Sequence, residues 1–488
     1  MPHSSLSVLV SWRRMGAMAA LAALTMATAC APVAAHTPAT SGSPSAAAAP
    51  SPGSWRVPPA YGRDLSAVAG AYTMKLQSAT ALGTWVYMDG ATSFNAAIDH
   101  QLLAALDKHT GGPYQPAVDK AQEGHPATAE LAVDGSLAHA SGNFLIGRLR
   151  TTIGQGPGSS DETTIVYDSG TGATVPSTEL VLPTHRAHLA ALAQSSTGLN
   201  SSTLLSLTDL AFDDTGNLTV TVPVAAPILS DSGYRTVTVP SATARPWLSE
   251  LGQRVQDAAA SPWKPPTPEA KALRHVNCDI VACAALTYDD GPAQATTPQL
   301  LRTLEQAGAG ATFFAVGGAA NYSPELVRAE HDAGFTVGNH TWSHADLRLL
   351  SPGAIVDQIQ RSNTAIKAAT GEVPTLMRPP YGGVNQRMRQ NVGMPIILWS
   401  VDSLDWLTRD PAKYTPAIMA QVAPGAIILE HDIHATTVDH QAALIADLQK
   451  AGYTLVTVPQ LFAGIDLQPG QTYGCRGHGR GCTPSPGR

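Results

Sequence analysis

The sequence contains few charged residues and has no excess of basic ones. Charged side chains make up 14% of the 488 residues, and the formal net charge is −7. A protein that binds the phosphates of a nucleic acid needs a basic face, so the composition argues against a nucleic-acid partner. Apolar residues make up 44% of the chain, which is ample for a buried core, and the length fits roughly two to three domains.

The apolar stretch near the N-terminus is too short to cross a bilayer. Residues 15–26 follow Arg13 and Arg14, and a basic start before a short apolar run is typical of an export signal. We therefore expect residues 1–35 to form such a signal.

Two processing sites compete at the end of this signal. Residues 27–30 are similar to a bacterial lipobox, which predicts a lipid anchor at Cys30. Residues 33–35 offer an ordinary small-residue cleavage site instead. In both cases we expect an extracellular protein, secreted or anchored at the outer face of the cytoplasmic membrane and cell wall. Contact with the membrane is expected only through that anchor.

Cysteine is scarce, with five residues in the chain. Apart from Cys30, the cysteines fall into two close pairs, Cys278 with Cys283 and Cys475 with Cys482. Paired cysteines in an exported protein predict disulfide bonds. Two local bonds and a crosswise pairing both fit the sequence, and a four-cysteine zinc site is the less favoured alternative in an oxidising compartment.

Composition divides the chain into two folded regions. Residues 36–60 consist mainly of Ala, Pro, Ser and Thr, which predicts a disordered linker, and a second, Pro-rich linker covers residues 262–274. Between them, residues 61–261 contain short apolar runs separated by turn residues, together with two amphipathic segments, so we expect an α+β accessory domain. The expected strands are residues 142–149, 163–167, 218–224 and 234–239, and the expected helices are residues 93–107 and 184–193, each with a hydroxyl residue to cap its start.

From residue 275 to residue 465, apolar runs of strand length alternate with amphipathic stretches that end at glycine. Alternation of strand and helix predicts a parallel sheet with right-handed crossovers. About seven such units in a segment of this length fit a small or incomplete (β/α) barrel, followed by a disulfide-containing tail at residues 466–488. The expected strands are residues 280–288, 312–316, 336–339, 375–377, 396–401, 426–429 and 453–458.

Polar residues follow these strands, at the edge of the sheet where parallel barrels build their sites. Asp289 and Asp290 end the first strand, and adjacent carboxylates there predict a bound cation unless they form a solvated turn. His340 and His344 are four residues apart, which would place them on one face of a helical turn, as metal ligands require. Two imidazoles and a carboxylate leave a position open for water, which is the catalytic zinc arrangement.

Three further stretches supply candidates for the remaining roles. Arg378 ends a strand within Arg-Pro-Pro-Tyr-Gly, and a buried guanidinium needs a carboxylate partner. Asp405 lies within Asp-Ser-Leu-Asp-Trp, and His431 within Leu-Glu-His-Asp. A histidine at a strand end near an Asp has a raised pKa and can serve as a general acid. A structural ion pair and a core histidine are the alternative interpretations.

In this order, the five stretches resemble the polysaccharide deacetylases, the NodB-like family 4 of carbohydrate esterases. The shared pattern is Thr-Phe/Tyr-Asp-Asp, His-x-x-x-His, Arg-x-Pro-Tyr, Asp-x-x-Asp-Trp and Leu-x-His, with Tyr288 here in place of Phe, and it extends from Thr287 to His431. The resemblance covers residues 279–463. Residues 163–193 resemble the extracellular domain found in some bacterial anti-sigma factors and beside some deacetylases.

The resemblance implies a metal site and a base. Asp290, His340 and His344 would bind a divalent metal, with zinc expected and cobalt as an alternative. Asp289 would be the general base that takes a proton from water, and Arg378 would keep it oriented.

The resemblance also implies an acid and a substrate pocket. The backbone amide of Tyr381 would hold the developing oxyanion. His431 would protonate the leaving amine and would be tuned by Asp405. Trp406 and Leu429 would shape the pocket for the acetyl methyl group. We expect no direct chemical role for the neighbouring polar residues Asp402, His434, Asp439 and His440, or for His331 on a predicted surface helix.

The implied function is a metal-dependent hydrolase that removes N-acetyl groups from a cell-wall glycan. Peptidoglycan is the expected substrate, and a monomer is the expected assembly. A chitin deacetylase or an acetyl-xylan esterase is the alternative within the same family. From another class, the chain could be a wall-binding or sensing protein with an inactive barrel, but an intact set of acid, base and ligands argues against that.

Overall fold

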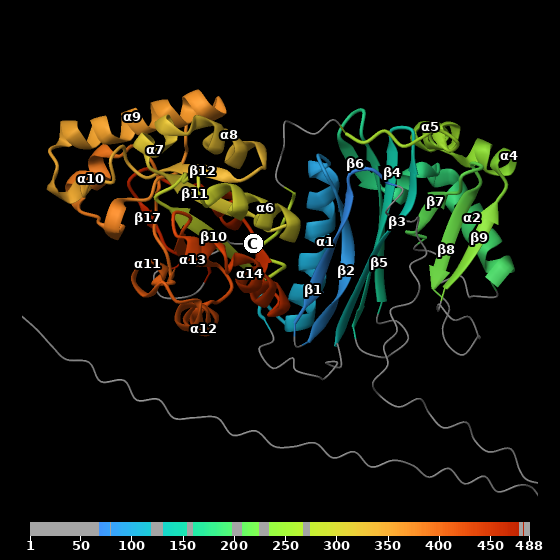
Figure 1. Ribbon diagram of the computed structural model, residues 1–488. Coiled ribbons are helices and arrows are strands. Elements are labelled where there is room, and N and C mark those ends of the chain that lie inside the picture. The colour runs from blue at the N-terminus through green and yellow to red at the C-terminus, as the bar shows by residue number, and fades with distance from the viewer. Residues whose placement is uncertain are drawn as a thin grey trace, which may run out of the picture. The chain divides into compact units, whose positions relative to one another are not determined.

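The computed structural model describes residues 68–78, 80–118, 130–153, 160–197, 207–223, 234–266, 274–477 and residue 482 (Figure 1). The expected export signal, the lipid anchor at Cys30 and the linker at residues 36–60 lie outside the described residues, as do positions 267–273 of the Pro-rich linker. Within the described residues, no helix combines the length and apolar character needed to cross a membrane.

The accessory region begins with a six-stranded sheet. Its strands follow one another in the order β1-β2-β3-β4-β5-β6, and all neighbours are antiparallel except β2 and β3, which α1 connects in parallel. Helix α1 lies along one face of this sheet (Figure 1). The elements are β1 (Ala71–Gln77), β2 (Ala81–Met88), α1 (Thr92–Thr110), β3 (Leu131–Ser141), β4 (Phe144–Ile153), β5 (Ser160–Asp168) and β6 (Ala173–Pro176).

A smaller layer follows, with a three-stranded antiparallel sheet in the order β7-β8-β9. Its apolar side chains share a buried cluster with residues of β4 and β5. The expected strands correspond to β4, β5, β8 and β9, and the predicted α+β class is confirmed. The elements are η2 (Ser177–Leu180), α2 (Pro183–Thr197), β7 (Leu210–Phe212), β8 (Leu218–Pro223), β9 (Tyr234–Val239), α4 (Ser241–Ala244), η3 (Arg245–Trp247) and α5 (Glu250–Ala258).

The hydroxyl cap expected at the start of the first helix is wrong. Helix α1 is preceded by Ala91, which makes no side-chain cap. The Ser93 hydroxyl instead donates a hydrogen bond to the carbonyl of Gly172, 2.6 Å away, because the turn between β5 and β6 lies beside it. A tertiary contact has replaced the local one.

Close packing of α1 on the sheet depends on a glycine. A Cβ at Gly147 of β4 would lie 2.5 Å from the ring of Phe94 on α1. Only glycine therefore lets this ring rest directly on the strand backbone.

The second region is a parallel (β/α) barrel, as predicted. Its strands lie in the order β12-β11-β10-β15-β14, with β16 also beside β10, and every pair is parallel. Single bridges from Asn339 to Met377 and from Met377 to Ile396 carry the sheet round to β13. The strands are β10 (Cys283–Asp289), β11 (Ala311–Ala315), β12 (Thr336–Asn339), β13 (Ile396–Ile397), β14 (Val401–Asp402), β15 (Ala426–His431), β16 (Thr454–Leu455) and β17 (Thr472–Tyr473).

Helices connect these strands, and glycine ends several of them. Gly308 and Gly371, which follow α6 and α9, have the left-handed backbone that such a cap requires. The helices are α6 (Thr297–Ala307), α7 (Gly317–Tyr322), α8 (Pro324–Asp332), η4 (Leu347–Leu349), α9 (Pro352–Thr370), η5 (Pro380–Gly382), α10 (Gln386–Asn391), α11 (Asp405–Thr408), α12 (Pro411–Gln421), α13 (Ala435–Val438), α14 (Gln441–Lys450) and α15 (Val458–Leu461).

Two expected strands are interrupted. Residues 375–377 form only the bridge at Met377, and residues 396–401 are split into β13 and β14. The reason is Arg378, whose guanidinium donates hydrogen bonds to the carbonyls of Ile397 and Leu398, at 3.2 and 3.1 Å. Those carbonyls therefore accept hydrogen bonds from a buried guanidinium instead of from a neighbouring strand.

The tail expected beyond residue 465 takes part in the barrel. Strand β17 pairs in parallel with β13, and Cys475 bridges to Ala426 at the start of β15. Arg476 makes an ion pair of 2.9 Å with Asp279. The disulfides are the two local bonds, Cys278–Cys283 and Cys475–Cys482.

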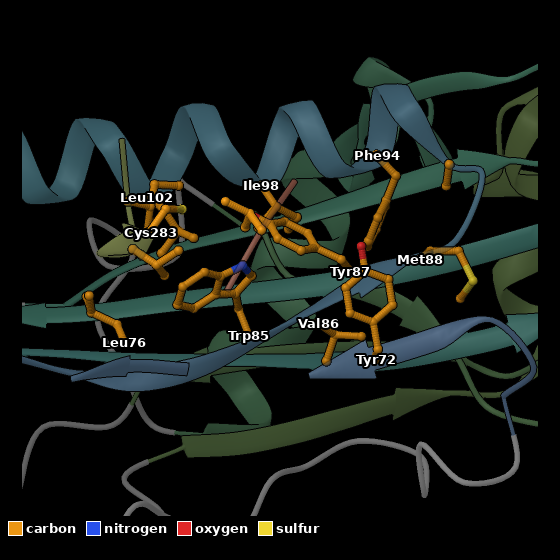
Figure 2. Packing of buried hydrophobic residues seen from close by; sticks show 14 of the residues in the cluster. Tyr72, Leu76, Trp85, Val86, Tyr87, Met88, Phe94, Ile98, Leu102 and Cys283 are labelled. Carbon is orange, nitrogen blue, oxygen red and sulfur yellow. The ribbon is translucent and has the colours of Figure 1, made fainter. Parts of the chain in front are cut away.

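One cluster of buried apolar side chains contains residues of both regions. Figure 2 shows aromatic residues of the accessory sheet and α1, among them Trp85 and Phe94, in the same cluster as Cys283 of β10. The cluster also includes Ile280 and Phe462 of the barrel region. His275, just before the barrel, is held at the same place, because its Nε2 lies 2.7 Å from Asp99 of α1.

Candidate active site

The five polar stretches meet at the carboxyl ends of the barrel strands. Asp289 is the last residue of β10, and its register partner on the neighbouring strand β15 is His431. His340 follows β12 directly, and Arg378 follows the bridge at Met377. The parallel sheet thus gathers residues that lie far apart along the chain.

A carboxylate and two imidazoles converge at this edge. Oδ1 of Asp290 lies 3.4 Å from Nε2 of His340 and 3.2 Å from Nε2 of His344. One donor atom from each residue falls within 4.8 Å of the others. Nδ1 of His340 lies 2.7 Å from the carbonyl of Arg378, which leaves Nε2 for a ligand.

The helical turn expected for the two histidines is wrong. They lie in an irregular loop in which Thr341 and His344 have positive φ values of 65° and 55°. Asn339 holds this loop, because its side-chain oxygen accepts a 2.7 Å hydrogen bond from the Thr341 amide. Its amide group is fixed in turn by the carbonyl of Ile359. Sequence reasoning missed Asn339, although an Asn at a strand end is typical of a turn whose side chain bonds the backbone.

Electrostatics at this cluster favour an ionised carboxylate. Burial alone would raise the pKa of Asp290, but the neighbouring imidazoles outweigh it and lower the pKa to about 2. Burial lowers the pKa of His344. An ionised carboxylate beside a neutral imidazole is the state in which these groups bind a metal.

Asp289 forms an ion pair with Arg378 and is not one of the three residues of the ligand cluster. Arg378 is fully buried, and one Nη lies 2.9 Å from Oδ1 of Asp289 and 2.7 Å from the Thr287 hydroxyl. The guanidinium also lies over the ring of Phe314, 4.3 Å from its centroid. The second oxygen of Asp289 lies 3.7 Å from Nε2 of His340 and so faces the ligand cluster. One oxygen is therefore fixed while the other remains available beside the cluster.

Asp405 and His431 form a second pair. Oδ1 of Asp405 lies 2.8 Å from Nδ1 of His431, and Oδ2 accepts hydrogen bonds from the His431 amide and the Thr437 hydroxyl. Ser403 donates a further bond to Oδ1. Burial alone would lower the pKa of His431, but Asp405 raises it to about 9. Sequence reasoning gave Ser403 no role, although it lies two residues before Asp405 and bonds it locally. Nothing in the sequence pattern indicated Thr437, because its contact joins α13 to a residue 32 positions earlier.

The residues predicted to contact substrate lie around these groups. Tyr381 is exposed, and its ring lies 4.8 Å from that of His344. Its φ of 61° turns the backbone sharply after two prolines. Trp406 is half-exposed, whereas Leu429 is buried on β15.

The polar residues expected to stand outside the chemistry have contacts of their own. Asp402 accepts a hydrogen bond from the Leu404 amide, and Asp439 accepts one from Gln299 at the surface. His440 precedes α14, and His331 lies on α8, 3.8 Å from Glu372. His434 is closer to the site, because its ring centroid lies 5.6 Å from that of His431.

Comparison with known proteins agrees with this arrangement. A family model described as polysaccharide deacetylase matches residues 277–394. A peptidoglycan-N-acetylglucosamine deacetylase of Listeria monocytogenes is 39% identical over 209 residues, which are 43% of this chain and 43% of that protein. A peptidoglycan-N-acetylmuramic acid deacetylase of Bacillus subtilis is 42% identical over 177 residues, 36% of this chain and 38% of that protein. A chitooligosaccharide deacetylase of a Bradyrhizobium strain is 34% identical over 194 residues, 36% of this chain and 89% of that protein.

The chain thus spans less than half the length of the first two relatives but most of the third. The residues that the family model matches contain the first three polar stretches, those of Asp289 and Asp290, of His340 and His344, and of Arg378. The chain belongs to the polysaccharide deacetylase family.

Proposed function

We propose that the protein is an exported, metal-dependent hydrolase that removes N-acetyl groups from peptidoglycan. The observation that carries the proposal is the convergence of Asp290, His340 and His344 beside a carboxylate that Arg378 holds separately. The names of the Listeria and Bacillus relatives support a cell-wall glycan as the substrate. The disulfides fit an oxidising compartment outside the cytoplasm.

The ligand cluster fits a divalent metal, and we propose zinc. Two imidazole nitrogens and one carboxylate oxygen point at a common place, and His340 has the backbone hydrogen bond that fixes its tautomer. When bound there, such an ion would polarise the acetamide carbonyl and make water acidic enough to attack it.

The remaining groups divide the proton transfers between them. The free oxygen of Asp289 would accept the proton of the attacking water, while Arg378 keeps that carboxylate in place. The backbone amide of Tyr381 would donate to the oxygen on which charge develops. His431, kept protonated by Asp405, would donate a proton to the leaving amine. The expelled amine is a poor leaving group, so the acid is required.

Acetate release from a panel of glycans tests this proposal. Peptidoglycan, chitin oligomers and acetylated xylan would each be incubated with the wild-type chain and with Asp289→Asn. We expect release from peptidoglycan and, because a general base contributes about 10²–10⁴-fold, a loss of that order in the variant. Equal release by both proteins would contradict the assignment of the base.

The panel also separates the alternatives. Preference for chitin oligomers would favour the activity named for the Bradyrhizobium relative, which matches over most of its length. Preference for acetylated xylan would favour an esterase. Binding of glycan without acetate release from any substrate would favour a wall-binding protein.

A further inference from the structure

A short helix beside His431 presents a cation at the rim of the site. Helix α11 has left-handed backbone at both ends, with φ of 57° at Leu404 and 51° at Arg409. Its first residue is Asp405, which is buried and bonded to His431. Because Asp405 anchors the helix, the two sharp turns leave Trp406 and Arg409 exposed next to the acid.

Arg409 is held in place but has no acidic partner among the described residues. Its Nε donates a 3.0 Å hydrogen bond to the backbone carbonyl of Trp406, which fixes the guanidinium against α11. Within the part of the chain that the structure describes, no carboxylate lies within ion-pair distance of Arg409. The adjacent Asp410 pairs with Lys413 instead, at 3.1 Å. Both Nη groups of Arg409 can therefore bind an external anion.

The cation faces the acid side of the site. His434 is half-buried, and its ring lies 5.6 Å from that of His431. The Arg409 amide donates a 3.1 Å hydrogen bond to the carbonyl of Asp405, the residue that holds His431. In agreement with this placement, burial lowers the pKa of His434 and the charge of Arg409 lowers it further. A neutral His434 can still donate a hydrogen bond to an anion that Arg409 binds. Figure 1 shows α11 and α13 near each other, and the bond from Thr437 to Asp405 joins them.

A neutral polysaccharide has no anionic group that the Arg409 guanidinium could bind. Chitin carries only hydroxyl and acetamido groups, whereas peptidoglycan has a 3-O-lactyl ether on every second sugar. A guanidinium matches a carboxylate through two parallel hydrogen bonds, which favours an anionic glycan over a neutral one of the same shape.

We propose that Arg409, with His434 beside it, binds the lactyl carboxylate of the glycan and makes the site selective for lactyl-bearing strands. This inference rests on the proposed deacetylase function, because it places the acetamide at the site described above. It assigns Arg409 a role in specificity and none in the bond-breaking steps.

Kinetics on matched glycans test the inference. The substrates are a neutral chitin oligomer, a peptidoglycan strand stripped of peptide so that its lactyl carboxylates are free, and the same strand with its peptides attached. For Arg409→Gln we expect kcat/KM on the stripped strand, divided by that on chitin, to fall about three- to tenfold relative to wild type, mainly through KM. In Arg409→Lys the ratio should lie between those of Arg409→Gln and the wild type, because lysine keeps the positive charge but cannot make two parallel hydrogen bonds to a carboxylate.

Lys413→Gln is the matched control. It removes the same charge from the same surface, but Lys413 is already paired with Asp410, so the ratio should stay at the wild-type value. An unchanged ratio in Arg409→Gln would overturn the inference, as would a parallel loss on all three substrates. Selectivity that appears only with peptide-bearing strands would overturn the lactyl assignment, since the lactyl carboxyl is then an amide.

Calorimetric titration tests the role of Arg409 separately from the proposed deacetylase function. The stripped strand and the chitin oligomer would be titrated into the full-length wild-type chain and into Arg409→Gln, and the ratio of their Kd values would be compared. A lower preference for the stripped strand in the variant supports the inference without any turnover. Absence of acetate release by the wild type would contradict the proposed function alone, whereas equal Kd ratios would contradict the role of Arg409 alone.

Discussion

The carboxylate of Asp405 sets the protonation state of His431. It is fully buried and accepts hydrogen bonds from the amide and the ring of the histidine, so the charged imidazole is stabilised where burial alone would disfavour it. The pKa of His431 is raised to about 9 as a result. A general acid must be protonated to act, so this pair keeps the acid ready throughout the neutral range.

The first prediction concerns the pH profile. Activity should fall as pH rises through about 9, because His431 then loses its proton. In Asp405→Asn this basic limb should move down toward the ordinary imidazole pKa of about 6.5. Thr437→Val, which removes one hydrogen bond to Asp405 but keeps its charge, should move the limb less. A basic limb at the same pH in all three proteins, measured as kcat against pH, would show that another group titrates.

A second residue, Glu330, is a source of instability. It is completely buried on α8, and neither carboxylate oxygen has a hydrogen-bond partner among the residues that the structure describes. Burial raises its pKa well above the ordinary value, and the nearby charge of Asp432 adds to the effect. A raised carboxyl pKa means that stability is fully present below the unfolded pKa, near 4.5, and is lost as pH rises toward the folded pKa.

Glu330→Leu should therefore stabilise the protein at neutral pH. We expect a gain of about 1–3 kcal/mol at pH 7, because an unsatisfied buried acid is replaced by an apolar side chain. The gain should shrink at pH 4, where the wild-type acid is protonated in both states. Glu325→Leu, at an exposed position of the same helix, is the control and should show no such pH dependence. Chemical denaturation at the two pH values measures the difference, and a destabilised Glu330→Leu would mean that the acid has a partner after all.

At the scale of elements, the strands and their order along the chain follow from the sequence because buried parallel strands are continuous apolar runs. The same reasoning locates Asp289 and His431, since each is the last residue of a strand formed by such a run. It fails for the loop of His340 and His344, where a side chain of Asn339 replaces helical hydrogen bonds. It also fails for the broken strand at residues 396–401, because the donor that takes its carbonyls, Arg378, is distant in sequence.

The contacts of the C-terminal tail could not be predicted from the sequence either. Its Gly-rich sequence has no strand pattern, yet β17 completes the barrel beside β13. Just after β17, the tail also packs on Gly425, whose φ is +86° and where a Cβ would lie 1.8 Å from the carbonyl oxygen of Arg476. Contacts of backbone with backbone leave no signal in hydrophobic periodicity.

Gly425→Ala tests how much the tail contributes. We expect a loss of about 2–4 kcal/mol, from the positive φ together with displacement of the tail strand. Gly393→Ala is a matched control, because Gly393 also has a positive φ, of +65°, but no atom of the described chain lies within 4 Å of its Cβ position. The difference between the two variants in thermal unfolding measures the tail contact. Equal losses would mean that backbone strain alone accounts for the effect.

For the whole molecule, the accessory region and the barrel share buried apolar surface. Residues such as Trp85 and Leu102 belong to the same cluster as Cys283 (Figure 2), and this cluster also contains Ile280 and Phe462. The catalytic groups lie at the carboxyl ends of the strands, whereas Cys283, which belongs to the shared cluster, begins β10. The contact with the accessory region should therefore affect stability more than chemistry.

Separation of the two regions gives the last prediction. A fragment of residues 274–488 keeps the site and the tail but exposes its part of the shared cluster, so its midpoint of thermal unfolding should fall by at least about 5 °C relative to the full chain. Its acetate release from a small acetylated sugar at low temperature should stay within about threefold of the full chain, since less than about 1 kcal/mol of barrier is at stake. A shorter fragment of residues 275–465 also loses β17 and the ion pair of Arg476, so it should unfold at a still lower temperature. A folded but inactive longer fragment would instead mean that the accessory region completes the site, and the separation of stability from chemistry would fail.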